Sequence, residues 1–208
     1  MNLRRLGLWL SFLWPLALAA ITHAHAAATV GQSAPAFALP DTSGKTVSLG
    51  DFKGKTVVLE WVNPGCPFVQ KHYKSANLPG TQKAAVDRGV VWLAINSTAP
   101  GTSDHLSPES MAAWMVKHQA AATATLMDGD GRVGRAYGAK TTPHMYIIDP
   151  RGILVYAGAI DSKPTAKIDD IKTATNYVNQ ALGEVLAGKP VGTPLTQAYG
   201  CTVKYAAG

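Results

Sequence analysis

The sequence is poor in cysteine and in charged residues. It holds only two cysteines, Cys66 and Cys201, in 208 residues, and 15% of its residues are charged. It contains no internal repeat and no low-complexity tract. A chain of this length with 47% hydrophobic residues can bury a core of ordinary size without disulfide staples. The net charge of +6 is not gathered into a Lys/Arg cluster, so the sequence offers no basis for nucleic-acid binding.

The first 26 residues have the pattern of a secretory signal peptide. Arg4 and Arg5 precede an apolar run from Leu6 to Ile21, and small residues offer cleavage sites at 24–26 and 26–28. A membrane anchor is the alternative, but the apolar run is short for a membrane span. We therefore expect cleavage after residue 26 or 28 and a periplasmic or secreted protein that has no membrane association once the signal is removed.

Residues 29–208 alternate between strand and helix patterns, which predicts a single α/β domain with parallel strands, helical crossovers and an antiparallel edge. An extended hairpin is expected at 36–39 and 46–49, before the main strands. Those strands are expected at 56–62, 90–96, 123–127, 144–148 and 153–156. Helices are expected at 68–75, 81–88, 107–119, 131–137 and 169–186, with Pro79-Gly80 interrupting the first two. A tail follows from about residue 189.

Cys66 stands where a buried strand gives way to a helix. A residue at this point lies beside unpaired helix N–H groups and the positive end of the helix dipole, and both favour a thiolate over a thiol. The thiolate is the nucleophile in disulfide exchange and in peroxide attack. The alternative is an inert core cysteine. Because Cys66 lies between Gly65 and Pro67 at an element boundary, the sequence favours the reactive role.

Two segments together resemble a known family. They are Val57-Val58-Leu59-Glu60-Trp61 with Cys66-Pro67-Phe68-Val69, and Tyr137-Gly138-Ala139 with Thr142-Pro143-His144-Met145-Tyr146-Ile147-Ile148-Asp149. They resemble the thioredoxin superfamily, and most closely its redoxin branch of peroxiredoxin-like, AhpC/TSA-type proteins. The resemblance implies a thioredoxin-like domain with a mixed central sheet flanked by helices. It also implies that Pro143 is a cis-proline and that Thr142 presents backbone groups to a bound partner.

The sequence departs from that family in three ways. The Cys-x-x-Cys pair of thioredoxins is absent, because Val69 and Asn63 stand where the second cysteine would be. A peroxiredoxin would have Thr or Ser at position 63 and Pro at position 59, where this chain has Asn63 and Leu59. No arginine is evidently placed to polarise a peroxide. Neither self-contained disulfide exchange nor standard peroxidase activity follows from the resemblance alone.

Three further residues are candidates for the site. Cys201 could resolve an oxidised Cys66, or the two could form a fixed structural disulfide. His72 and His144 could favour the Cys66 thiolate or move a proton, and the alternative for each is a packing role. Cys66 with both histidines could also form a soft-metal site, for example for copper, although no short ligand spacing supports one.

The function expected from these residues is an exported thiol oxidoreductase with no cofactor. Its partners would be a thiol or disulfide protein, or a small peroxide or thiol. The alternative is a binding module of the same fold without enzymatic activity.

Overall fold

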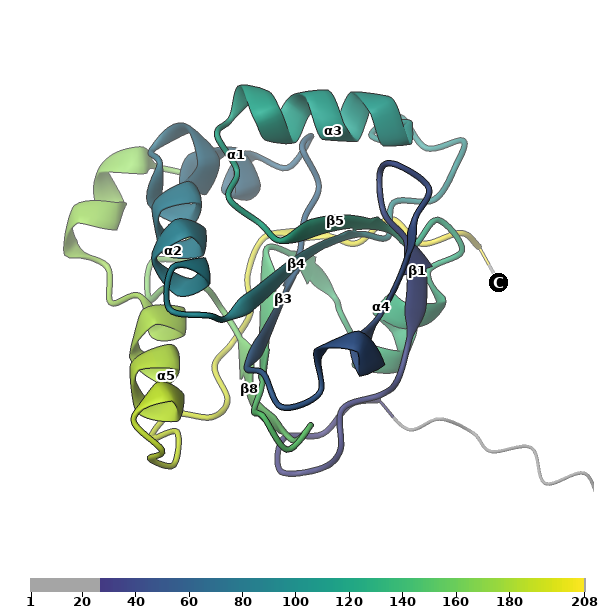
Figure 1. Ribbon diagram of the computed structural model, residues 1–208. Coiled ribbons are helices and arrows are strands. Elements are labelled where there is room, and N and C mark those ends of the chain that lie inside the picture. Colours follow the sequence, from purple (N-terminus) through teal and green to yellow (C-terminus); the bar gives the residue numbers. More distant parts are fainter. Residues whose placement is uncertain (1–26, 208) are drawn as a thin grey trace, which may run out of the picture.

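A computed structural model describes residues 27–207. Their framework is a five-stranded sheet in the order β5-β4-β3-β7-β8 (Figure 1). Its strands are β3 (Val57–Trp61), β4 (Val91–Asn96), β5 (Ala124–Met127), β7 (His144–Ile148) and β8 (Leu154–Gly158). β3 runs parallel to β4 and β4 to β5, whereas β7 is antiparallel to both β3 and β8. The α/β class with a mixed sheet is therefore confirmed. The signal peptide expected over residues 1–26 lies outside the described residues.

The remaining elements surround this sheet. The expected hairpin is β1 (Ala38–Pro40) with β2 (Thr46–Ser48), and a second small ladder joins β6 (Thr141–Thr142) to β9 (Cys201–Thr202). The helical segments are η1 (Leu49–Phe52), α1 (Pro67–Lys74), α2 (Asn77–Val86), α3 (Pro108–Lys117), α4 (Arg132–Tyr137), η2 (Ile168–Thr173) and α5 (Tyr177–Leu186). Within residues 27–207, no helix is both long enough and apolar enough to cross a membrane.

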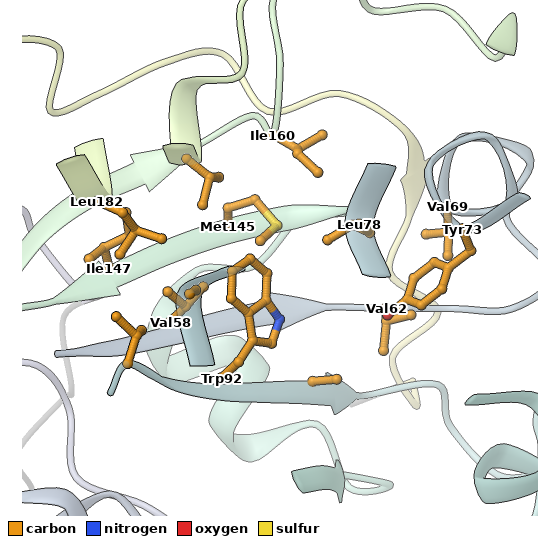
Figure 2. Packing of buried hydrophobic residues seen from close by; sticks show 14 of the residues in the cluster. Val58, Val62, Val69, Tyr73, Leu78, Trp92, Met145, Ile147, Ile160 and Leu182 are labelled. Carbon is orange, nitrogen blue, oxygen red and sulfur yellow. The ribbon is translucent and has the colours of Figure 1, made fainter. Parts of the chain in front are cut away.

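The central strand β3 is buried on both faces because its side chains alternate between two hydrophobic clusters. Val58 belongs to the first cluster, together with residues of α1, α2, α3 and α5. Figure 2 shows part of this cluster around Trp92. Val57, Leu59 and Trp61 belong to the second cluster, to which the β1–β2 hairpin and α4 contribute. Figure 1 accordingly shows α2 and α5 on the side of the sheet away from β1 and α4.

The break between α1 and α2 lies earlier than the sequence predicts. The chain breaks at Ala76, whose φ of 59° is left-handed, and α2 begins at Asn77. Pro79 and Gly80 therefore lie inside α2 and do not interrupt it. Proline is tolerated there because the N–H groups of a first helical turn have no partner within the helix.

The sequence predicts a single helix over residues 169–186, and this prediction was wrong in one respect. The structure divides it into η2 and α5, separated by an extended stretch around Ala174. This stretch pairs with the segment before it, since the Ser162 N–H donates to the Thr175 carbonyl at 3.1 Å. Asn176 then caps α5, its side chain accepting from the Asn179 N–H. Asparagine at this point was the sequence signal for a new helix start.

Candidate active site

Cys66 lies at the junction that the sequence indicates. β3 ends at Trp61, the chain turns through Asn63-Pro64-Gly65, and Cys66 is the N-cap of α1 with Pro67 at the first helical position. The side chain of Asn63 holds this turn by accepting from the Gly65 N–H at 2.7 Å. Cys66 is buried, with 1% of its surface exposed. The end of a central strand and the start of a helix thus fix the position of the sulfur.

The Cys66 thiol contacts a segment far away in the sequence. The Thr142–Pro143 peptide bond is cis, and Cys66 Sγ donates to the Thr142 carbonyl oxygen at 3.0 Å. The N-cap side chain makes no hydrogen bond to the helix N–H groups. This contact joins the sulfur at the positive end of α1 to the residue that precedes the cis-proline.

Cys201 is the strand partner of the same Thr142. β9 pairs antiparallel with β6, which sets Cys201 opposite Thr142 and Thr202 opposite Thr141. Cys201 is therefore part of a short strand, where the sequence suggested an irregular tail. Both cysteines are free thiols. Burial, followed by a hydrogen bond with Cys66, raises the pKa of Cys201 to about 12. Cys201 accordingly stays protonated beside Cys66 at neutral pH.

His72 joins α1 to the tail and makes no hydrogen bond with Cys66. The Asn77 amide nitrogen lies 2.8 Å from Nδ1 and donates to it, so Nε2 carries the hydrogen and donates to Tyr199 Oη at 3.1 Å. The Tyr199 hydroxyl in turn donates to Asp161. Burial lowers the pKa of His72 to about 4, with Asp161 opposing this shift and Lys71 adding to it.

His144 is also neutral near pH 7. Its Nδ1 lies 3.4 Å from the Lys140 backbone N and 3.2 Å from Tyr146 Oη. Burial lowers the pKa of His144 to about 4, and the positive charge of Lys140 lowers it further. Because both imidazoles are uncharged at neutral pH, neither adds a positive charge beside Cys66.

No soft-metal site is formed by the expected residues. Among residues 27–207, no three His, Cys, Asp or Glu side chains gather as metal ligands would. His72 instead lies in a buried group with Lys71 and Asp161, in which Lys71 Nζ is 3.5 Å from Asp161 Oδ2. Lys71 also donates to the Lys163 carbonyl at 2.9 Å.

Sequence reasoning missed three residues that shape this site, namely Lys71, Asp161 and Tyr199. Asp161 is far from α1 in the sequence, and only the folded chain brings it to Lys71 and His72. A local signal existed for Tyr199, since an aromatic residue and a glycine directly precede Cys201. A tyrosine whose hydroxyl is buried needs a hydrogen-bond partner, which here is the Asp161 carboxylate.

The burial of His72 predicts a loss of stability in acid. The unfolded chain takes up a proton near pH 6.5, whereas the folded chain does so only near pH 4. The contribution of His72 to the free energy of unfolding should therefore have its full value above pH 6.5. It should fall by about 3 kcal/mol as the pH drops towards 4. Urea unfolding of the parent and of His72→Gln, across this pH range, measures the contribution. The gap in stability between them should narrow below pH 6.5, and a constant gap would contradict the prediction.

Comparison with known proteins gives a family match and several relatives. Residues 30–157 match the family model described as AhpC/TSA family. A Bacillus subtilis (strain 168) protein, thiol-disulfide oxidoreductase ResA, is 27% identical over 132 residues, which are 60% of this chain and 64% of that protein. The chain thus spans less than two thirds of the length of the curated relatives that it matches.

Solved structures share the fold. The hypothetical protein SMc02350 from Sinorhizobium meliloti 1021 is 29% identical, with a TM-score of 0.77, and the match covers 88% of this chain and 98% of that one. The thioredoxin domain of thiol-disulfide oxidoreductase BVU-2223 from Bacteroides vulgatus is 22% identical, with a TM-score of 0.51, over 70% of this chain and 96% of that one. The family match covers more than half of the chain, and its segment contains both Cys66 and the cis-proline that faces it. This chain belongs to the AhpC/TSA family and has a thioredoxin-like fold.

Proposed function

We propose that this protein is an exported thiol oxidoreductase in which Cys66 is the nucleophile and Cys201 resolves it. One observation carries the proposal. Cys66 donates to the Thr142 carbonyl, and Cys201 is the strand partner of the same Thr142. Two thiols that adjoin one residue are placed to form a disulfide with each other.

With a disulfide substrate, Cys66 gives its proton to solvent, and the thiolate attacks one substrate sulfur. The substrate disulfide breaks, a mixed disulfide with Cys66 forms, and the first substrate thiolate leaves and is protonated. Cys201 then loses its proton and attacks the Cys66 sulfur, which releases the second substrate thiol and leaves a Cys66–Cys201 disulfide. The substrate gains two electrons and the protein loses two, so an external thiol must reduce the protein again.

A small peroxide fits the same pair of cysteines. The Cys66 thiolate attacks one peroxide oxygen, the O–O bond breaks, and the departing alkoxide or hydroxide takes up a proton. The resulting sulfenic acid reacts with Cys201, water leaves, and the same internal disulfide forms. Thr142 and Pro143 position the substrate in both reactions by lining the approach to the sulfur.

A resolving role for Cys201 requires that its disulfide with Cys66 can be reduced again, whereas a structural role does not. The raised pKa of Cys201, caused mainly by burial, supports Cys66 as the thiol that attacks the substrate first. Export rests on the sequence pattern of residues 1–26, and it sets the reaction outside the cytoplasm, in the periplasm or the medium. The physiological partner is then a thiol or disulfide protein, or a small peroxide or thiol.

The test is non-reducing peptide mapping of the full chain after treatment with a small disulfide or with peroxide. We expect one intramolecular link between the Cys66 and Cys201 peptides, which glutathione or thioredoxin opens. If Cys201 stays free, or if the cysteines bridge only between chains, Cys201 is not the resolving residue. A link that forms but resists both reductants would instead identify a structural disulfide, and hence a binding module without enzymatic turnover.

A further inference from the structure

The strand edge beside Cys66 is occupied by the protein's own tail. β6 offers the backbone groups of Thr141 and Thr142, and β9 pairs with both. The pairing continues past β9, since the Val203 N–H donates to the Lys140 carbonyl at 3.0 Å. Strand edges of this kind bind extended peptides by adding a strand. In this molecule, residues 199–206, which we call the tail strap, already fill that position.

Gly200 permits an unusually close approach to this edge. Its φ is +132°, and a Cβ placed on it would overlap the Thr142 carbonyl oxygen and lie 2.8 Å from the carbonyl carbon. This is the same carbonyl to which Cys66 donates. The residue before Cys201 must therefore lack a side chain if the strap is to lie against Thr142.

Tyr199 anchors the strap to α1. Its ring packs edge-on against Phe68 with the ring centres 5.8 Å apart. Its hydroxyl accepts from His72 and donates to Asp161, and the Lys71 ammonium lies 5.7 Å from the centre of its ring. These contacts hold the strap immediately before Gly200.

Tyr205 anchors the other end. Its hydroxyl donates to the Ala139 carbonyl at 2.7 Å, and the Arg135 guanidinium lies 4.7 Å from the centre of its ring. The ring fits against Gly134, where a Cβ would collide with it. Between the anchors, the Val203 side chain is buried in the second cluster. The strap is thus fastened on both sides of Cys201, and Cys66 beneath it is almost wholly buried.

We propose that the tail strap is a built-in occupant of the strand-pairing edge at Thr142, and that an extended polypeptide reaches Cys66 only by displacing it. The partner that fits the vacated edge is an extended cysteine-bearing segment with glycine directly before the cysteine, as in Gly200-Cys201. This inference rests on the proposed function, because the partner segment is the class of protein substrate that the oxidoreductase would accept.

The first test measures how fast iodoacetamide alkylates Cys66 in full-length Cys201→Ser protein, where Cys66 is the sole thiol. Adding Gly200→Ala should lift the strap and raise the rate at least about tenfold, because access then no longer depends on rare local opening. Gly188→Ala is the matched control. Gly188 also has a positive φ, of +69°, but a Cβ there would meet nothing within 4 Å, so the rate should stay within about twofold of the parent.

Two further measurements keep the test decisive. Hydrogen exchange at the Val203 amide reports whether the strap has left, and circular dichroism reports whether the variant is folded. If Gly200→Ala does not fold, Tyr205→Ala releases the other anchor and should raise the alkylation rate in the same direction. The proposal is overturned if a folded variant with a released strap is alkylated at the parent rate. It is also overturned if the parent reacts as fast as an unfolded cysteine peptide.

The peptide site is tested with the strap-released variant. A synthetic peptide Tyr-Gly-Ser-Thr-Val-Lys-Tyr should slow alkylation of Cys66, and the same peptide with alanine in place of glycine should not. Equal protection by both peptides, or by neither, would overturn the assignment of partner chemistry. None of these readouts needs turnover. A protein without oxidoreductase activity can still give the expected rates, and an active oxidoreductase with equal rates in all variants would refute this inference alone.

Discussion

Replacing Cys66 with serine is expected to lower the rate of disulfide or peroxide reduction to the uncatalysed background, a loss of about 10³-fold or more. The serine hydroxyl remains protonated at neutral pH and cannot enter a disulfide, so neither reaction can begin. The side chains differ little in size, and serine can still donate to the Thr142 carbonyl as Cys66 does. The variant should therefore remain folded. Steady-state turnover with a thiol reductant measures the loss.

Cys201→Ser is the matched control, because it leaves the first step intact and removes the second. Mixed with an aromatic disulfide that releases a coloured thiolate, it should release one equivalent quickly and then remain as a mixed disulfide on Cys66. Cys66→Ser should release no such burst. Full turnover by Cys66→Ser would show that the chemistry lies elsewhere in the chain, whereas full turnover by Cys201→Ser would leave Cys66 as the nucleophile with an external resolving thiol.

Replacing Glu60 with leucine is expected to lower the free energy of unfolding by about 4 kcal/mol. Glu60 lies on β3 and is fully buried. Its carboxylate accepts from Tyr73 Oη at 2.8 Å, from Gln82 Nε2 at 2.9 Å and from Trp92 Nε1 at 2.8 Å. Leucine would leave these donors without an acceptor in the first hydrophobic cluster, part of which is drawn around Tyr73 and Trp92 in Figure 2.

Glu60→Gln should cost less, because one acceptor oxygen remains. The amide of Gln82 cannot turn to compensate without loss, since its Oε1 accepts from the Ala121 N–H at 2.8 Å. Urea unfolding of both variants measures the difference, with the exposed Glu109→Gln as control, which should change stability by less than about 0.5 kcal/mol. A Glu60→Leu protein as stable as the parent would show that the three donors find other partners.

The pH dependence of these variants is a second readout. Burial raises the pKa of the Glu60 carboxyl, although its three hydrogen bonds lower it. The folded chain then keeps a proton that the unfolded chain has lost, so the contribution of Glu60 to stability falls as the pH rises above the ordinary value of 4.5. Glu60→Gln should remove this dependence, which runs opposite to that of His72.

Much of the fold could be predicted from the sequence because its signals are local. The apolar run at residues 56–62 and the turn at Pro64-Gly65 are enough to predict a buried strand followed by a helix capped by Cys66. Local signals were weakest where one helix meets another. The break at Ala76 depends on a left-handed backbone conformation, which alanine does not favour and which the sequence therefore does not predict. The extended stretch near Ala174 depends on pairing with Ser162.

The sequence by itself determined the fold class and the place of Cys66 at a helix start, because periodicity and capping act over a few residues. Only the tertiary structure decided what surrounds that sulfur. Thr142 is 76 residues away in the chain, yet its carbonyl accepts from Cys66, and the register of β9 alone sets Cys201 beside it. The neutral state of His72 was likewise decided by burial against Tyr199 and Asp161. Contacts of this range depend on the whole path of the chain, which no local pattern encodes.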